Sequence, residues 1–589
     1  MMCYYLLKLL IAADNSLHLL DTIISHTYTS RPCYKKAIFI FLQLVIVTIL
    51  SSSSRGLDFT SSNLPIVVID TQGNTIPDEP KITVRMGIID NGPGNRNNLT
   101  DPFNDYDSLI GIEIRGSSSQ TWPKKQYGFE TRDDSNEDLD VSLLGLPEES
   151  DWILNAPYID KSFMRNALIF KLSRDMGMYA PRTRFVEVVL NGQYQGIYVL
   201  IEKIKRGKDR VDISKLTPDE NSGDDLTGGY IIKIDKPGED FFVSPYPPPG
   251  NPNRVIKYQY EYPKDDDISD IQKEYIQNVL FEFEDMMASP DDADPDEGYA
   301  KYIDLNSFID FMLLNEMSKN VDGYRLSTFM YKDKESKDGR LKMGPIWDFD
   351  LAFGNANYYG ATEWTDWQIK LLKRAATSDT YQVPFWWYVL VQDSTFITEI
   401  NTRWQELRQT VLSTENILHY IDQVADTLNE AQERNFEIWS APGESGFGFW
   451  PVPPVFYTFS TFQDEIDYLK QWIENRLNWM DENLPLLASD IIYIKETQGY
   501  RPVHFDLKQN FPNPFNQKTF ISYQLSADSD VRLDIYNIQG RLIETLINER
   551  QGVRYYTVKF DGTTLPSGIY FYRLSTEQHQ SVKSMLLIK

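Results

Sequence analysis

Hydrophobic and polar positions divide the chain into a strand-rich first part and a helix-rich second part. From Leu64 to about Thr131, short runs of β-branched residues predict strands. Asn191-Gly192 lies between two further alternating runs and is a strong hairpin signal. Apolar residues then recur at helical spacing. The segments with this spacing are 160–176, 268–288, 305–319, 390–432 and 461–482. We therefore expect an α+β domain over 60–485, with two lobes and a cleft between them.

From about residue 500 the pattern changes back to short alternating strands. The clearest runs are 519–525, 531–536, 568–574 and 583–588. Strands of this length, with turns about every eight to twelve residues, are typical of an all-β sandwich of the immunoglobulin-like type. We expect this small module to occupy 500–589.

The N-terminal region resembles a secretory signal. Lys35-Lys36 precede the apolar run 37–50, and four serines follow it. This order of basic, apolar and small residues is that of a signal peptide, so 1–54 is assigned to the signal region. The apolar run is shorter than the ~20 residues that span a bilayer, although an N-terminal membrane anchor is the alternative. For residues 1–34, one explanation is a start codon assigned too far upstream.

Composition limits the chemistry that the mature chain can perform. The net charge is −27, which argues against nucleic acid and against anionic lipid as partners. Both cysteines, Cys3 and Cys33, lie in the region predicted to be removed, and the remaining histidines are scattered singly. Thiol chemistry, a Ser-His-Asp triad and a typical zinc site are therefore disfavoured. Catalysis would depend on carboxylates, lysines and a bound metal ion. We expect no transmembrane span in the mature chain.

Three aspartates form the strongest candidate site. Asp322 follows a predicted helix, and Asp348 and Asp350 follow the second of two predicted strands, 328–331 and 341–346. If these strands pair, the open end of the hairpin brings Asp322 near Asp348. Such a cluster binds a hard cation, Mg²⁺ or Mn²⁺, and suits phosphoryl transfer. The alternative is a set of solvated turns, but apolar residues flank the last two aspartates, and buried carboxylates need partners.

Several blocks of the main domain resemble the CotH family of atypical, kinase-like proteins. These blocks, in the family's order, are 115–119, 122–127, 160–167, 190–198 and 347–355. The resemblance covers about 60–485. It implies a two-lobed fold similar to protein kinases and transfer of phosphate from ATP to serine or threonine of surface proteins.

The resemblance also implies roles for individual residues. Asp322 resembles the catalytic aspartate, and Asp348 the metal-binding aspartate, with Asp350 as a second ligand. The implied nucleotide-binding residues are Lys125 or Lys124, the turn residues Gly116, Ser117 and Ser118, and Glu202, which either contacts adenine or pairs with a neighbouring lysine. Ser327 stands where the family often has an asparagine that binds a second metal ion, so two-metal catalysis is in doubt. The chain has no Gly-rich G-x-G-x-x-G loop.

The C-terminal module resembles the sorting domain of the type IX secretion system. The resemblance rests on 509–516, on the turn 535–540 and on 567–570. It implies passage through the periplasm, contact with the type IX machinery and export across the outer membrane, so that the protein is secreted or held at the cell surface. An ordinary carbohydrate- or protein-binding sandwich is the alternative.

These observations predict an exported, Mg²⁺- and ATP-dependent protein kinase. ATP is scarce beyond the inner membrane, so the alternative is a weak or inactive kinase fold that serves as a surface or adhesion protein. The aromatic-rich loop 447–457 is a candidate partner surface for that role. A hydrolase that uses two carboxylates is a third hypothesis.

Overall fold

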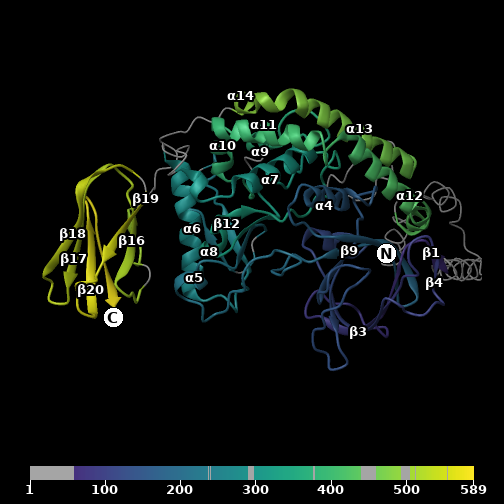
Figure 1. The fold of residues 1–589 in the computed structure, drawn as a ribbon, viewed down its shortest axis with the longest axis horizontal. Helices are drawn as coiled ribbons and strands as arrows, with labels where there is room; N and C mark the ends of the chain where they lie inside the picture. Colours follow the sequence, from purple (N-terminus) through teal and green to yellow (C-terminus); the bar gives the residue numbers. More distant parts are fainter. Residues whose placement is uncertain are drawn as a thin grey trace, which may run out of the picture. The chain divides into compact units, whose positions relative to one another are not determined.

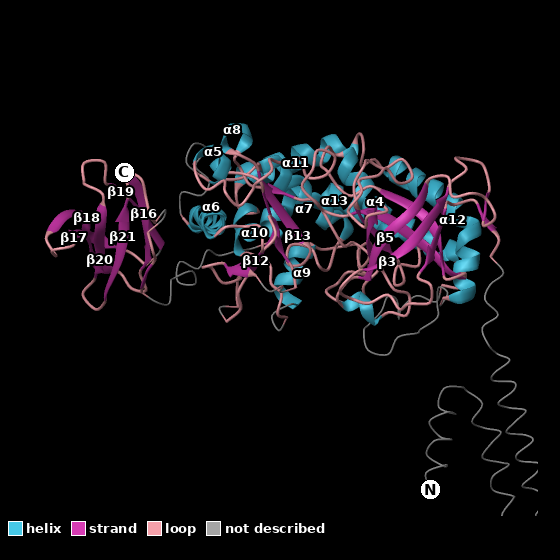
Figure 2. Ribbon diagram, turned by 90° about the horizontal axis from the view of Figure 1, so that it is seen from below, coloured by secondary structure: helices cyan, strands magenta, loops and turns pink. Residues whose placement is uncertain are grey.

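A computed structural model describes the chain from Phe59 to Lys589. The residues that it does not describe within this span are 237, 239, 252, 290–297, 376–378, 440–458, 492–504, 511–512 and 554. The predicted signal region 1–54 and the aromatic-rich loop 447–457 lie outside the described residues. The described chain is a mixed α+β structure with a β-rich C-terminal region, as predicted (Figures 1 and 2).

The strand-rich first part closes into a seven-stranded barrel in the order β2-β3-β5-β6-β7-β9-β8. The strands are β2 (Ile66–Asp70), β3 (Ile82–Ile89), β5 (Tyr106–Ile114), β6 (Tyr127–Arg132), β7 (Asp151–Asn155), β8 (Thr183–Leu190) and β9 (Gln193–Glu202). All neighbours are antiparallel except β2 and β8, whose parallel pairing closes the barrel. The predicted hairpin at Asn191-Gly192 is confirmed, with φ of 51° and 75°, as a tight hairpin turn requires.

The second part of the chain surrounds a five-stranded sheet with helices. The sheet has the order β11-β12-β10-β13-β14. Its strands are β10 (Tyr230–Ile234), β11 (Phe241–Val243), β12 (Lys257–Tyr262), β13 (Thr328–Lys332) and β14 (Lys342–Met343). The main helices are α4 (Arg165–Asp175), α6 (Asp270–Ala288), α7 (Leu305–Ser318), α9 (Gln368–Ala375), α10 (Phe385–Leu390), α11 (Ser394–Arg408), α12 (Thr414–Ile438) and α13 (Phe462–Asn483). We call the sheet with these helices the helical part.

Local sequence explains most of these elements. Ser269 and Gln272 form a capping box that begins α6 at the predicted place. The predicted hairpin of β13 and β14 is confirmed, with Met330 opposite Met343. The helical stretch predicted at roughly 390–432 contains α11 and the larger part of α12. The chain turns after α11, and Ser413 caps α12 by accepting a hydrogen bond from the Asn416 amide.

Asn435 of α12 ties the helical part to the barrel. Its Oδ1 accepts hydrogen bonds from the Ile197 amide at 3.1 Å and from Lys124 Nζ at 2.9 Å. Figures 1 and 2 both show α12 beside the barrel. The barrel and the helical part therefore have a fixed contact on one side of the space between them.

The C-terminal residues form two antiparallel sheets, β15-β16-β19 and β18-β17-β20-β21. The strands are β15 (Asp506–Leu507), β16 (Lys518–Gln524), β17 (Ser529–Asn537), β18 (Leu542–Gln551), β19 (Tyr555–Asp561), β20 (Gly568–Ser575) and β21 (Gln580–Leu587). Ile521 of one sheet and Leu533 of the other belong to the same buried core, so the sheets pack face to face. The narrower, immunoglobulin-like assignment stays a prediction. Among the described residues, none of the helices has the length and apolarity needed to span a membrane.

Candidate functional site

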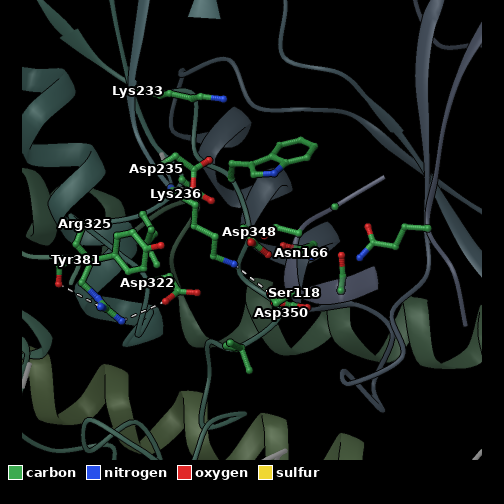
Figure 3. A pocket seen from close by; sticks show the side chains of 18 of the residues that line it. Ser118, Asn166, Lys233, Asp235, Lys236, Asp322, Arg325, Asp348, Asp350 and Tyr381 are labelled. Carbon is green, nitrogen blue, oxygen red and sulfur yellow. Dashed lines mark hydrogen bonds and ion pairs between the residues drawn. The ribbon is translucent and has the colours of Figure 1, made fainter. Parts of the chain in front are cut away.

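A cavity of about 780 Å³ lies between the barrel and the five-stranded sheet. Its lining comes from the segment after β5, the end of β10, the loop after α7 and the segment after β14. Residues that are distant in sequence, such as Ser118, Lys236, Asp322 and Asp348, meet there (Figure 3). A volume of this size falls in the range of small-molecule sites.

Asp322 is held in the loop that follows α7. The helix ends at Lys319, whose φ is 47°, and the Lys319 ammonium donates to the carbonyl oxygens of Gly360, Glu363 and Thr365 at 2.7–2.8 Å. These bonds fix the loop that carries Asp322 against the segment 360–365. Asp322 points into the cavity (Figure 3).

The Asp322 carboxylate is paired with Arg325. Arg325 Nη2 lies 3.3 Å from Asp322 Oδ1, and Nη1 lies 2.7 Å from Asp379 Oδ2. The pKa of Asp322 is raised to about 6. Burial is the main cause, the Arg325 charge opposes it, and the nearby Asp348 carboxylate adds to the rise. Asp322 is therefore mostly ionised at neutral pH and close to the range of a general base.

Asp348 and Asp350 form a pair of carboxyl groups in the same cavity. Their side chains are hydrogen-bonded to each other, and low access to water raises the pKa of both. The segment between them is fixed on two sides. Phe349 N donates to Asn166 Oδ1 at 2.7 Å, and Asn355 Nδ2 donates to the Asp350 carbonyl oxygen at 2.6 Å. Two acids held this close either share a proton or bind a cation.

Left-handed backbone conformations occur along the cavity wall. Asp348, Ser327 and Tyr359 line the cavity with φ of 64°, 46° and 51°. Such backbone conformations are unfavourable for residues other than glycine, and they cluster at functional sites. Asp348, five residues after the end of β14, combines this conformation with a carboxyl group that lines the cavity.

Cations from both sides face these carboxylates. Lys236 Nζ donates to Ser118 Oγ at 3.1 Å. The Arg115 guanidinium lies 5.7 Å from the Trp347 ring centroid, and it has no ion pair with any carboxylate of the described residues. Burial lowers the pKa of Arg115, and the Asp348 charge partly offsets this effect. Lys233, which also lines the cavity, is paired with Glu261 at 3.0 Å.

Seven of the ten residues predicted for the site line this cavity. They are Gly116, Ser117, Ser118, Asp322, Ser327, Asp348 and Asp350. The two lysines predicted to bind nucleotide do not reach it. Lys124 is 2% exposed and donates to the Ile197 carbonyl oxygen and to Asn435. Lys125 Nζ turns back onto the carbonyl oxygens of Gln120 and Trp122 at 2.7 and 2.9 Å. Both ammonium groups are thus used within the fold.

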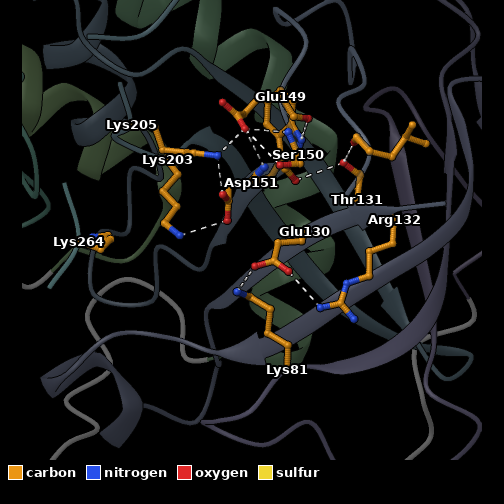
Figure 4. A network of polar contacts seen from close by, with 12 residues as sticks. Lys81, Glu130, Thr131, Arg132, Glu149, Ser150, Asp151, Lys203, Lys205 and Lys264 are labelled. Carbon is orange, nitrogen blue, oxygen red and sulfur yellow. Dashed lines mark hydrogen bonds and ion pairs between the residues drawn. The ribbon is translucent and has the colours of Figure 1, made fainter. Parts of the chain in front are cut away.

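Glu202 does not line the cavity either, because it is enclosed by arginines. Glu202 Oε1 lies 2.6 Å from Arg210 Nη1 and 2.9 Å from Arg182 Nη1. The expected pairing of Glu202 with a neighbouring lysine is not found. Lys203 and Lys205 instead bind Asp151, at 3.1 and 2.7 Å, in a surface network at the β6-β7 side of the barrel (Figure 4).

Sequence reasoning missed several charged residues of the wall. They are Arg115, Lys233, Asp235, Lys236, Arg325 and Asp379. Arg115 stands inside a motif block, directly before Gly116, and this position is the signal that could have identified it. For Lys236 the available signal is weaker: it follows the apolar strand β10 with Asp235, where a buried strand ends at the surface of a cleft.

The donor set fits a divalent cation that arrives with phosphates. No group of three or more His, Cys, Asp or Glu side chains within the described parts of the chain forms a ready-made metal site. Mg²⁺, however, is commonly held by one or two carboxylates, waters and substrate phosphates. Asp348 and Asp350 supply two carboxyl groups, and Arg115, which has no ion pair among the described residues, lines the same cavity. Apolar and aromatic residues such as Phe170 and Ile201 complete the lining.

Comparison with known proteins agrees with the predicted family. The model of the family described as "CotH kinase protein" matches residues 112–480, and the model described as "Secretion system C-terminal sorting domain" matches residues 509–589. The sorting domain indicates export to the cell surface or secretion.

Individual relatives are distant. Inner spore coat protein H of Bacillus subtilis (strain 168) is 21% identical over 245 residues, which are 42% of this chain and 59% of that protein. The match thus spans less than two thirds of that relative. A structure of the twitchin kinase region from C. elegans matches at 10% identity over 87% of this chain and 98% of that chain, with a TM-score of 0.13. Since the kinase-protein model covers more than half of the residues, the chain belongs to the CotH family.

Proposed function

We propose that the protein is an exported CotH-like kinase that transfers the γ-phosphate of ATP to serine or threonine hydroxyls of secreted or surface proteins. The observation that carries this proposal is the placement of Asp322 and of the Asp348–Asp350 pair on one cavity with Arg115 and Lys236. Barrel and helical part would correspond to the two lobes of an atypical kinase-like domain over 60–485. The module 500–589 would engage the type IX machinery.

In this proposal Asp322 is the general base. Its carboxylate accepts the proton of the substrate hydroxyl, the hydroxyl oxygen forms a bond to the γ-phosphorus, and the bond between that phosphorus and the ADP oxygen breaks. ADP leaves with the bonding electron pair. Arg325 holds Asp322 in place at 3.3 Å and keeps part of its charge compensated. Positioning and electrostatic stabilisation supply most of the catalysis in phosphoryl transfer.

The remaining wall residues would bind the nucleotide. Asp348 and Asp350 would hold Mg²⁺ or Mn²⁺, which when bound neutralises phosphate charge. Ser327 is a candidate ligand for a second ion, weaker than the asparagine of related proteins. Arg115 and the turn Gly116 to Ser118 would contact phosphate oxygens, in place of Lys124 and Lys125.

A binding role without catalysis is the second candidate. The observation in its favour is that Arg325 and Lys236 already compensate the cavity carboxylates without any ligand. A protein that kept these pairs could use the domain for adhesion at the cell surface, where ATP is scarce.

The full-length exported chain tests the proposal directly. Incubation with radiolabelled ATP and Mg²⁺, with a serine- and threonine-containing protein mixture from the cell surface, should label acceptor proteins. Asp322→Asn should abolish the labelling. Asp107→Asn is a matched control, because this aspartate pairs with Arg85 at the exposed barrel surface, outside the cavity lining. Labelling that is equal in wild type and Asp322→Asn would contradict the proposed role of Asp322. No labelling in any variant would favour the binding role.

A further inference from the structure

Lys236 connects the two walls of the cavity. It follows β10 in the sheet of the helical part, and its Nζ donates at 3.1 Å to Oγ of Ser118, which lies after β5 of the barrel. Figure 3 shows the extended side chain crossing the cavity between Asp322 and Asp348. This contact joins the barrel and the sheet through the middle of the candidate site.

The Lys236 ammonium is not committed to a single carboxylate. Its charge acts on both Asp322 and Asp348, but it has no ion pair within 4.0 Å among the described residues. The other cations that line the cavity from the helical part differ in this respect. Lys233 is paired with Glu261 at 3.0 Å, and Arg325 is held by Asp379 at 2.7 Å. Lys236 is therefore the cation of the helical part that can move with the least loss of contacts.

The carboxylates explain why a mobile cation is needed there. Asp235, Asp322, Asp348 and Asp350 all line the same cavity, and their mutual repulsion is costly away from water. A lysine ammonium on a flexible four-carbon side chain can compensate several neighbouring charges in turn. A hydroxyl acceptor such as Ser118 holds the ammonium without neutralising it.

We propose that Lys236 is the internal counter-ion of this cavity, held by Ser118 when no ligand is bound and transferred to a phosphate oxygen when a metal-bound nucleoside polyphosphate enters. This inference rests on the proposed function. It assigns to a lysine of the helical part the phosphate contact that the sequence placed on Lys124 or Lys125.

The proposal predicts opposite effects on the metal ion and on the nucleotide. Without a ligand, Lys236 competes with a divalent cation for Asp322 and Asp348. Its removal should therefore strengthen the binding of the cation alone. The same change should weaken nucleotide binding, because a phosphate contact is lost. A residue that only supported the fold would change both affinities in the same direction.

The experiment uses the full chain and Mn²⁺ alone as the first probe, with free Mn²⁺ measured by electron paramagnetic resonance. Lys236→Met should lower the Kd for Mn²⁺ by about tenfold, as expected for loss of one competing charge. Lys236→Arg keeps the charge and should stay near wild type. Lys337→Met is the matched control: it removes the same charge from α8 (Glu335–Asp338), where the lysine is 56% exposed and outside the cavity lining.

The second probe is ATP with Mg²⁺, measured by isothermal titration calorimetry. Lys236→Met should raise the Kd by about tenfold, and Lys236→Arg should restore most of the affinity. Unchanged or weaker Mn²⁺ binding in Lys236→Met would overturn the proposal. If wild type binds no ATP, the phosphate contact and the proposed function both fail, whereas the Mn²⁺ result still decides whether Lys236 is the counter-ion. Thermal unfolding of each variant checks that the fold is intact.

Discussion

Arg325 Nη2 lies 3.3 Å from Oδ1 of Asp322, inside a cavity that Asp348 also lines. The arginine and the second aspartate act on Asp322 in opposite directions: Arg325 lowers its pKa, and Asp348 raises it. Burial outweighs the arginine, so the balance leaves the Asp322 pKa at about 6. This balance makes the site sensitive to pH and to single charge changes.

The pH profile of phosphate transfer should therefore have an acidic limb near pH 6. Asp322 must be ionised to accept the hydroxyl proton, so activity should rise as pH increases through its pKa of about 6. Arg325→Met removes the charge that lowers this pKa and should move the limb to higher pH by about one unit. The measurement is kcat/KM against pH. A limb that stays in place in Arg325→Met would contradict the pairing.

The buried Asp322 carboxylate should also lower the stability of the folded protein. Because its pKa is raised in the folded state, the folded protein binds the proton more tightly than the unfolded chain does, and stability falls as pH rises from about 4 to about 6. Asp322→Asn should lose this dependence and gain about 1–2 kcal/mol at pH 7. Urea unfolding at pH 4 and pH 7 measures it. A variant less stable than wild type at pH 7 would show that the Arg325 pair dominates instead.

Arg115 and Lys124 should behave differently when each is changed to methionine. Arg115 has no paired carboxylate among the described residues, so Arg115→Met should leave stability nearly unchanged and weaken Mg²⁺-ATP binding by about tenfold. Lys124 is buried and bonded to Ile197 and Asn435, so Lys124→Met should destabilise the fold by about 1–3 kcal/mol. Calorimetric titration and urea unfolding of both variants test this contrast. Weaker Mg²⁺-ATP binding in Lys124→Met with unchanged stability would restore the nucleotide-binding role predicted for Lys124 from sequence.

A buried ion cluster away from the cavity should control the stability of the helical part. Arg165 of α4 is fully buried, with Nη1 2.5 Å from Asp160 Oδ1 and 2.8 Å from Glu465 Oε1 on α13. Arg165→Met removes the cation that pairs with both buried carboxylates and should cost about 3–5 kcal/mol. Lys171→Met, on the same helix but in the partly exposed pair with Asp175, should cost less than about 0.5 kcal/mol. Similar losses in both variants would show that the buried cluster contributes no more to stability than a surface ion pair.

The sequence predicted the candidate site better than its surroundings. The hairpin of β13 and β14 has clear alternation and a polar turn, and it does bring Asp322 and Asp348 to one cavity. Closure of the barrel was not predictable in the same way, because it depends on the parallel pairing of β2 with β8, more than a hundred residues apart. Alternation identifies strands but not distant partners.

The charged residues that line the cavity were also hard to predict, because sequence does not reveal the direction of a side chain. Lys124 and Lys125 belong to a recognisable motif, but the direction of their side chains is set by the turn before β6 and by Asn435 of α12. Lys236 stands in no recognisable motif and reaches the site only because β10 lies beside β13 in the sheet. Side-chain direction at a cleft is thus a property of the assembled fold.

The central claim is that the cavity binds a metal-bound nucleotide through Asp348. Isothermal titration of the full chain with ATP, in the presence of Mg²⁺ and then of a chelator, tests it most directly. We expect binding that requires Mg²⁺, is lost in Asp348→Ala and persists in the surface variant Asp107→Asn. The absence of binding by wild type at millimolar ATP, or equal binding by wild type and Asp348→Ala, would contradict it.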